Sequence, residues 1–284
     1  MQELSYYAVL ILVFSIPAIN FDLPGSLGPV NRLLGIAAIL VWLSKVVFTQ
    51  QLRRPRIVHL LILLFVLLNL ASYFWSMEPS DSLDRTERLM QSCVLVLMVW
   101  DVCRTRAQVN MAHLLYVLGC YVAILSTVIN YLHGVKLGGE DRFAAAGFDP
   151  NDMGLILCMG IPWAWQLAIS KDQSRPLLRI IGYAYPAAAV LAILLAGSRG
   201  ALIAAIPGLF YVVITVRRAH PAARVALPAL MVAAVLILAS QRGGPLQRFT
   251  KLENSASAGN LTGRVDIWLA GVQIFEKHPL LGVG

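Results

Sequence analysis

Arg199, in the stretch LLAGSRGALIAAI at residues 194–206, is the residue whose type and setting most strongly suggest chemistry. It stands between two apolar runs, with glycines at positions 197 and 200. A guanidinium is planar and always charged, so it can bind a phosphate or diphosphate with two hydrogen bonds, and the glycines open the backbone to such a group. A simpler interpretation is that Arg199 anchors the helix ends among the lipid headgroups, as basic residues near span ends commonly do. Both interpretations place Arg199 at a membrane surface.

Further polar residues lie upstream, in the stretches GEDRF and FDPND. Arg142 could assist in binding a diphosphate, or it could pair with its two acidic neighbours, although exposed pairs of that kind contribute little. Asp149, Asn151 or Asp152 could cap the following helix. Alternatively, Asn151 or Asp152 could help to hold an acceptor sugar. These stretches therefore offer a second set of candidate binding residues.

Histidine and cysteine do not form a metal-binding pattern in this chain. Apart from His278, none of the histidines has an evident carboxylate partner at helical spacing, and the four cysteines lack CxxC spacing. We therefore expect no metal and no cofactor, and we interpret the cysteines as small apolar side chains. His278, just before Pro279, is interpreted as a loop residue that begins a turn or, alternatively, as a group in the site.

The composition indicates which elements must position these residues. Hydrophobic residues make up 58% of the 284 residues, charged residues make up 13%, and the mean hydropathy is +0.71. An average soluble domain has about 45–50% apolar and about 25% charged residues. The fold class predicted is therefore an all-α, polytopic integral membrane protein.

A membrane-spanning helix needs about 20 mostly apolar residues, and the sequence offers about nine such runs, with the N-terminus predicted to be cytoplasmic. The run at 89–103 is the weakest, because it is short and opens with polar residues. The runs lie near residues 4–19, 33–49, 57–75, 89–103, 109–132, 153–170, 179–197, 201–216 and 225–240.

The distribution of basic residues gives an independent test of this topology. With strict alternation of nine spans, the cytoplasmic loops hold twelve Lys and Arg residues, and the outer loops up to residue 240 hold six. This asymmetry is the one that the positive-inside rule expects. The net charge of +8 is thus explained by topology, and we do not expect a nucleic-acid partner.

The segment after the last predicted span differs from the rest of the chain. Residues 1–240 are predicted to form the transmembrane domain, and residues 241–284 the beginning of a large periplasmic loop. This segment starts polar and rich in Gly and Ser, and then becomes an amphipathic stretch near 264–276 with apolar residues at helical spacing. A helix of this kind is expected to lie along the membrane face.

Three stretches together resemble the O-antigen ligase and O-antigen polymerase superfamily of bacterial membrane glycan transferases. They are GFDPNDMGLILCMGIPWAW at 147–165, GSRGAL at 197–202, and GRVDIW followed by EKHPLLGVG near the C-terminal end. The resemblance runs from about residue 147 to residue 284, and the upstream helices match only in number and character. It rests on the order and spacing of the stretches and on their common place at the predicted outer face.

The resemblance implies a glycosyltransferase of the bacterial inner membrane, acting on its periplasmic face. The donor would be a glycan on undecaprenyl diphosphate, and the acceptor a hydroxyl of another glycan or glycolipid. The family's two essential arginines match Arg199 of GSRG and Arg264 of TGR, which would bind the diphosphate and stabilise the charge that develops on it. The motifs do not separate ligase, polymerase and protein O-glycosyltransferase branches, with ligase slightly preferred.

The family's general base is implied to be a histidine further along the periplasmic loop, followed by more helices. His278 matches the family's HP position and not that histidine. The chain is therefore expected to hold the front part of such an enzyme, or to be a degenerate copy that only binds the lipid carrier. A transporter of lipid-linked glycans is the alternative from another class. No Asp, Glu, Lys or Arg lies at the centre of a predicted span, which disfavours transport.

Overall fold

The computed structural model describes residues 1–20, 29–136, 142–170, 176–239, 264–279 and 282–283. All regular elements of these residues are helices, as the composition predicted. They are α1 (Gln2–Ala18), α2 (Val30–Thr49), α3 (Ile57–Ser72), η1 (Tyr73–Trp75), α4 (Pro79–Val102), α5 (Arg106–Leu132), α6 (Pro150–Ile169), α7 (Pro176–Ala196), α8 (Arg199–Thr215), η2 (Val216–Arg218), α9 (Pro221–Ala239) and α12 (Arg264–Lys277).

Each of the nine predicted apolar runs falls on one of the helices α1 to α9. Among the described residues, six of these helices are long and apolar enough to cross a membrane: α2, α3 with η1, α5, α6, α7 and α8 with η2. Helix α1 and the part of α9 from Pro221 to Ala233 are apolar but shorter. The chain is thus a multi-pass, all-α membrane protein, and the count of nine spans stays a prediction.

Helix α4 differs most from the expectation, because it begins at Pro79 and not near residue 89. The additional turns are polar, and they carry ordinary signals for the start of a helix. Pro79 occupies the first turn, where its missing N–H costs nothing, and Asp81 lies near the positive end of the helix dipole. Because the N-terminal part of α4 is polar, α4 is not among the six helices that are apolar enough to cross a membrane.

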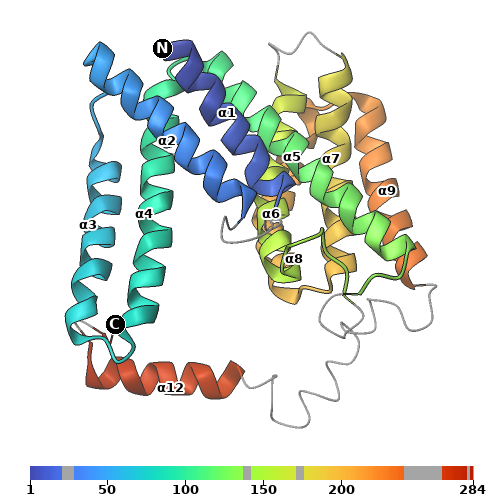
Figure 1. The fold of residues 1–284 in the computed structure, drawn as a ribbon. Coiled ribbons are helices and arrows are strands. Elements are labelled where there is room, and N and C mark those ends of the chain that lie inside the picture. The colour runs from blue at the N-terminus through green and yellow to red at the C-terminus, as the bar shows by residue number, and fades with distance from the viewer. Residues whose placement is uncertain (21–28, 137–141, 171–175, 240–263, 280–281, 284) are drawn as a thin grey trace. The chain divides into compact units, whose positions relative to one another are not determined.

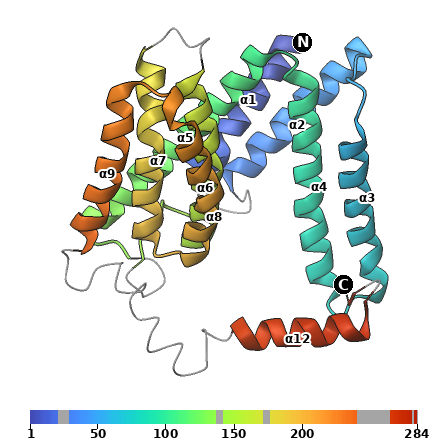
Figure 2. The same cartoon turned by 180° about the vertical axis from the view of Figure 1, so that it is seen from behind.

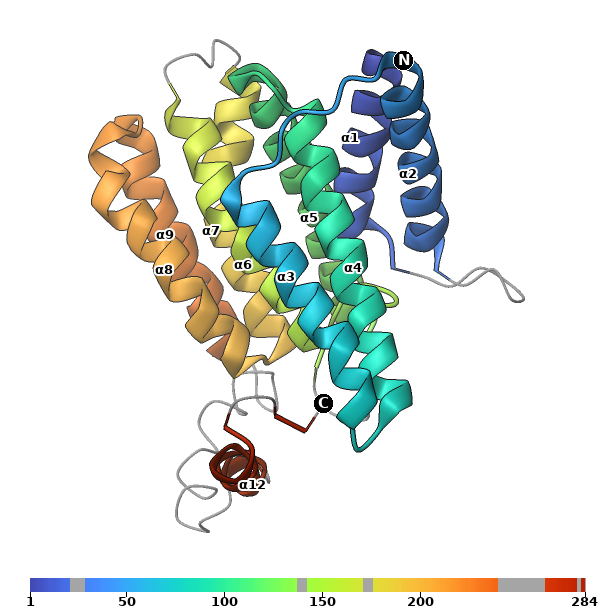
Figure 3. The ribbon, with the colours of Figure 1, turned by 90° about the vertical axis from the view of Figure 1, so that its left-hand side faces the viewer.

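The chain divides into two compact units, which are described separately. Unit 1 holds residues 1–6, 39–104 and 251–284, and its main feature is the antiparallel pair α3 and α4, which lie side by side in Figure 3. Unit 2 holds residues 7–38 and 105–250 and contains the bundle of α5, α6, α7, α8 and α9 (Figures 1 and 2). The predicted boundary at residue 240 lies outside the described residues.

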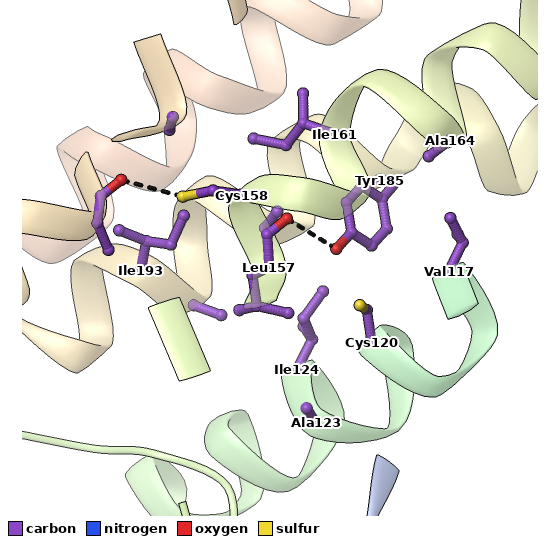
Figure 4. Packing of buried hydrophobic residues seen from close by; sticks show 14 of the residues in the cluster. Val117, Cys120, Ala123, Ile124, Leu157, Cys158, Ile161, Ala164, Tyr185 and Ile193 are labelled. Carbon is purple, nitrogen blue, oxygen red and sulfur yellow. Dashed lines mark hydrogen bonds between the residues drawn. The ribbon is translucent and has the colours of Figure 1, made fainter. Parts of the chain in front are cut away.

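The core of unit 2 lies between α5, α6 and α7, as Figure 4 shows. Tyr185 of α7 is fully buried there, and its hydroxyl donates to the carbonyl oxygen of Leu157 at 3.0 Å. Cys120 and Cys158 are buried in the same cluster. Cys93 and Cys103 are also buried and free, so the interpretation of the cysteines as small buried side chains is confirmed.

Small residues allow the helices of unit 2 to approach one another closely. A Cβ on Gly182 of α7 would lie 2.5 Å from the carbonyl oxygen of Ala164 in α6. A Cβ on Gly154 of α6 would lie 2.4 Å from the Cβ of Ala201 in α8. Close backbone contact of this kind is how membrane helices gain packing energy without a hydrophobic driving force.

The loops that connect the helices of unit 2 lie at two opposite ends of its bundle. At one end, the N-termini of α6 and α8 meet through Gly154 and Ala201. At the other end, the indole N–H of Trp165 donates to the hydroxyl of Thr215 at 2.8 Å, where α6 and α8 finish. The segments 142–149 and 197–198 therefore lie together at the first end, as the alternating topology predicted.

Candidate functional site

The segment that follows α5 is held firmly at the first end of the unit 2 bundle. The amide N–H of Phe143 donates to the carbonyl oxygen of Leu195 at 3.1 Å, and the side-chain amide of Asn130 donates to the carbonyl oxygen of Ala144 at 2.8 Å. The carbonyls in the last turn of α7 have no partner inside the helix. The segment satisfies one of them and thereby gains a fixed position over the end of α7.

The turn between α7 and α8 consists of two residues with well-defined roles. Gly197 has φ of +59°, a left-handed conformation that favours glycine and commonly ends a helix. Ser198 is the N-cap of α8, since its hydroxyl accepts from the N–H of Ala201 at 3.3 Å. Arg199 is consequently the first residue of α8, with no loop in which to move away.

Arg142, Asn151 and Ser198 form one hydrogen-bonded group at this end. Nη2 of Arg142 donates to Oδ1 of Asn151 at 2.8 Å, and the hydroxyl of Ser198 donates to the same oxygen at 2.9 Å. Nε of Arg142 donates to the carbonyl oxygen of Ala196 at 3.0 Å. Because arginine can only donate, Oδ1 of Asn151 must be the atom that faces it, which fixes the orientation of the amide.

This group ties three predicted elements together. It joins the segment after α5, the first turn of α6, and the turn that carries Arg199. The predicted residues Arg142 and Asn151 are thus joined to Ser198, which directly precedes Arg199. Pairing of Arg142 with Glu140 or Asp141, the alternative left open above, concerns two acids that lie outside the described residues.

Arg199 differs from Arg142 in its surroundings. Its side chain is half-buried, and no hydrogen bond or ion pair of its guanidinium is found among the described residues. Gly200, the next residue, has open space where a Cβ would stand. The N-terminus of α6 lies at the same end as that of α8, and helix N-termini carry partial positive charge. The local electrostatics therefore favour an anion beside Arg199.

The acidic residues of FDPND have separate positions. Oδ1 of Asp149 accepts from the N–H of Asn151 at 2.7 Å and from that of Asp152 at 3.4 Å, so Asp149 is the N-cap of α6. The expectation that one of these residues caps the helix is thereby confirmed. Asp152 is exposed on the first turn. It remains a candidate for binding an acceptor.

Arg264 and His278 belong to unit 1 and mark the two ends of α12. Arg264 is the first residue of α12, and its side chain lies outside the described part of the structure. His278 directly follows the helix, and its carbonyl oxygen accepts from the N–H of Gly282 at 3.1 Å. His278 and Pro279 lie in a bend and a turn after the helix, as the loop interpretation of His278 predicted.

The apolar side chains of α12 are exposed, which agrees with an amphipathic helix. Trp268 and Phe275, for example, are 67% and 64% exposed. Its bounds, Arg264–Lys277, are close to the predicted 264–276. The expectation that α12 lies on a membrane surface stays a prediction.

Two members of this site, Ser198 and Asn130, were not identified from the sequence. Ser198 could have been found, because a serine before a helical run is a common N-cap. The contact of Asn130 with Ala144 carries no local signal. Among the described residues, no group of three His, Cys, Asp or Glu side chains could hold a metal ion.

Comparison with known families found a match over the C-terminal third of the chain. Residues 185–284, from the middle of α7 to the C-terminal turn, match the family described as O-antigen ligase. Comparisons with curated proteins and with solved structures found no significant match. The match includes both GSRGAL and the stretch from GRVDIW to GVG, which carried the resemblance in the sequence. Residues 185–284, about a third of the chain, are therefore similar to the O-antigen ligase family.

Proposed function

We propose that this protein transfers a glycan from an undecaprenyl-diphosphate carrier to an acceptor hydroxyl at the periplasmic face of the bacterial inner membrane. The observation that carries the proposal is the half-buried Arg199, held rigidly at the start of α8 with no partner among the described residues. The O-antigen ligase match over the same region supports a glycan-transferring family. A ligase that acts on a glycolipid acceptor is preferred slightly over a polymerase.

The chemistry asks little of the protein beyond charge stabilisation and positioning. The acceptor oxygen forms a bond to the anomeric carbon of the donor sugar, and the bond from that carbon to the carrier diphosphate breaks. The electron pair leaves with the diphosphate, and the acceptor hydroxyl loses its proton to a base. Arg199 and Arg264 would neutralise the leaving diphosphate, because a guanidinium can make two hydrogen bonds to phosphate oxygens.

The group around Asn151 would serve the acceptor side of this site. Its Oδ1 is occupied by Arg142 and Ser198, so its NH₂ group is the part that can donate to a sugar hydroxyl. The exposed carboxylate of Asp152 could accept a hydrogen bond from the same sugar. His278 would contribute to binding of the substrate.

The test replaces Arg199 by lysine in the protein expressed from its complete reading frame. Lysine keeps the charge but loses the planar fork, so Arg199→Lys should reduce transfer from a polyprenyl-diphosphate-linked glycan by about 100-fold, as loss of one preorganised donor does in other sites. The matched control is Arg218→Lys, which changes an exposed arginine just beyond the opposite end of α8.

The two variants separate the interpretations of Arg199. An arginine that only anchors the helix would tolerate lysine, so equal activity of Arg199→Lys and Arg218→Lys would contradict the proposal. Binding of the polyprenyl diphosphate without any transfer by the unsubstituted protein would instead favour the carrier-binding alternative.

A further inference from the structure

A second cluster of charged residues lies in unit 1, at the end of the α3 and α4 pair opposite η1. Lys45 of α2 and Asp101 of α4 form an ion pair with Nζ and Oδ2 2.6 Å apart, and each side chain is only 1% exposed. Oδ2 of Asp101 also accepts from the indole of Trp42 at 2.9 Å. Its Oδ1 accepts from the backbone N–H of Arg53 at 2.9 Å and from Nη2 of Arg104 at 3.1 Å. The carboxylate is therefore fully engaged within the protein.

The cluster carries a large excess of positive charge. Residues 45–56 include Lys45, Arg53, Arg54 and Arg56 and no acid, and Arg104 is added from the end of α4. Asp101 is the single acid among residues 97–104. One carboxylate cannot balance five cations, so an anion from outside the chain would be strongly favoured at this place.

The guanidinium of Arg53 is held in an orientation that suits the binding of such an anion. Its Nη1 donates to the carbonyl oxygen of Trp100 at 3.0 Å, and its guanidinium carbon lies 3.6 Å from the centroid of the Trp100 ring. Stacking on the indole fixes the plane of the guanidinium. Among the described residues, Nε and Nη2 of Arg53 have no acceptor. Two donors of a fixed, half-buried fork are thus available.

A shallow cavity of about 540 Å³ lies directly at this fork. Its walls are formed by the linker between α2 and α3 together with the residue that follows α4, and they combine polar side chains with two guanidinium groups. The residues that line it are Gln50, Gln51, Leu52, Arg53 and Arg104. The cavity is wide enough for a phosphate and the group attached to it.

The surroundings of the cavity indicate that the anion belongs to a lipid. The cavity lies where α2 and α4 end and α3 begins, so it is at the level of helix ends, where phospholipid phosphates lie. Phe48 and Ile57, on either side of the linker, are 77% and 68% exposed and would contact acyl chains. A soluble anion has no acyl chain that could contact these apolar residues.

We propose that the cavity between the α2–α3 linker and Arg104 binds the phosphate of an anionic membrane phospholipid, with Arg53 as the principal contact. The excess of cations selects an anionic lipid, because a zwitterionic headgroup brings its own positive charge into the cluster. Basic residues lie on the cytoplasmic side by the positive-inside rule, so the lipid belongs to the cytoplasmic leaflet. This site is independent of the proposed glycan transfer at Arg199.

The test measures lipid binding to the full chain, purified in detergent and freed of lipid, by native mass spectrometry. Phosphatidylglycerol, phosphatidylcholine and inorganic phosphate are the probes. The variant is Arg53→Gln, which keeps the backbone N–H bonded to Asp101 and so preserves the ion-pair cluster. The control is Arg218→Gln, at an exposed arginine on the same predicted side of the membrane.

We expect phosphatidylglycerol to bind the unsubstituted chain and the Arg218→Gln variant equally, and the Arg53→Gln variant about fivefold more weakly, as for loss of one basic contact at a lipid surface. Equal binding by Arg53→Gln would overturn the proposal. So would binding of phosphatidylcholine as tight as that of phosphatidylglycerol, or displacement of the lipid by equimolar inorganic phosphate, which would indicate a site for a free anion.

Discussion

The buried pair of Lys45 and Asp101 leads to a quantitative prediction about stability. Asp101→Asn removes the negative charge while keeping the size of the side chain and an oxygen that can accept from the N–H of Arg53. Lys45 would then be an unbalanced cation that is 1% exposed, with the carbonyl oxygen of Gln51 at 2.8 Å as its other acceptor. Breaking a buried pair in this way costs about 3–5 kcal/mol.

Replacement of the other partner, Lys45, is expected to reduce the free energy of unfolding by less. In Lys45→Met, Asp101 would keep its contacts with the indole of Trp42, the N–H of Arg53 and the guanidinium of Arg104. We therefore place the loss at the lower limit of that range, about 3 kcal/mol. The double variant, which removes both charges of the buried pair, should be more stable than Asp101→Asn alone, because it avoids the burial of a lone lysine cation.

The assay is unfolding of the purified chain by SDS, followed by circular dichroism, for the two single variants and the double variant. Asp84→Asn serves as the control, because it changes an exposed acid of the same helix; such surface changes are usually within about 0.5 kcal/mol. A loss in Asp101→Asn no larger than in Asp84→Asn would refute the reasoning. Strict additivity of the two single variants would refute it equally, since it would mean that the two charges do not interact.

Two further predictions concern packing and topology. Gly154→Ala should destabilise the protein by about 1–3 kcal/mol, because the new Cβ would lie 2.4 Å from that of Ala201, whereas Gly35→Ala, with open space around it, should be neutral or slightly stabilising in the same SDS assay. For topology, cysteines placed at the exposed positions Ala146 and His220 should differ in intact cells with a permeabilised outer membrane. A membrane-impermeant thiol reagent should label Ala146→Cys and spare His220→Cys, and the reverse pattern would contradict a cytoplasmic N-terminus. The four natural cysteines are buried and give a low background.

The sequence was most informative about the helices and about which end of a helix each residue occupies. Apolar runs of sufficient length can form only one structure in a bilayer, so the positions of the helices follow from composition. Helix α4 was predicted too short because a search for spans stops where polar residues begin. The signals of its true start, Pro79 and Asp81, were present in the sequence but belong to helix capping and not to membrane crossing.

The contacts between distant residues could not be predicted in the same way. Asn151 and Ser198 are 47 residues apart, and Lys45 and Asp101 are 56 residues apart. The topology assigned each pair to one side of the membrane, but it does not specify which helices are neighbours or how they are rotated. Both pairs depend on helix packing, which small residues such as Gly154 determine through local fit. The roles of Arg199, Arg264 and His278 in binding stay predictions.

The arginines of this chain differ in a way that bears on the choice between anchoring and binding at Arg199. Arg104 and Arg142 are built into the protein, because each donates to a helix-terminal carbonyl and to a polar side chain. An anchoring arginine at the short α7–α8 turn could have been used in the same manner. Instead, Ser198 caps α8, Arg142 satisfies the carbonyl of Ala196, and Arg199 has no assigned structural task among the described residues. A half-buried guanidinium that the fold does not use is costly to maintain, and binding an anion from outside the chain would offset that cost.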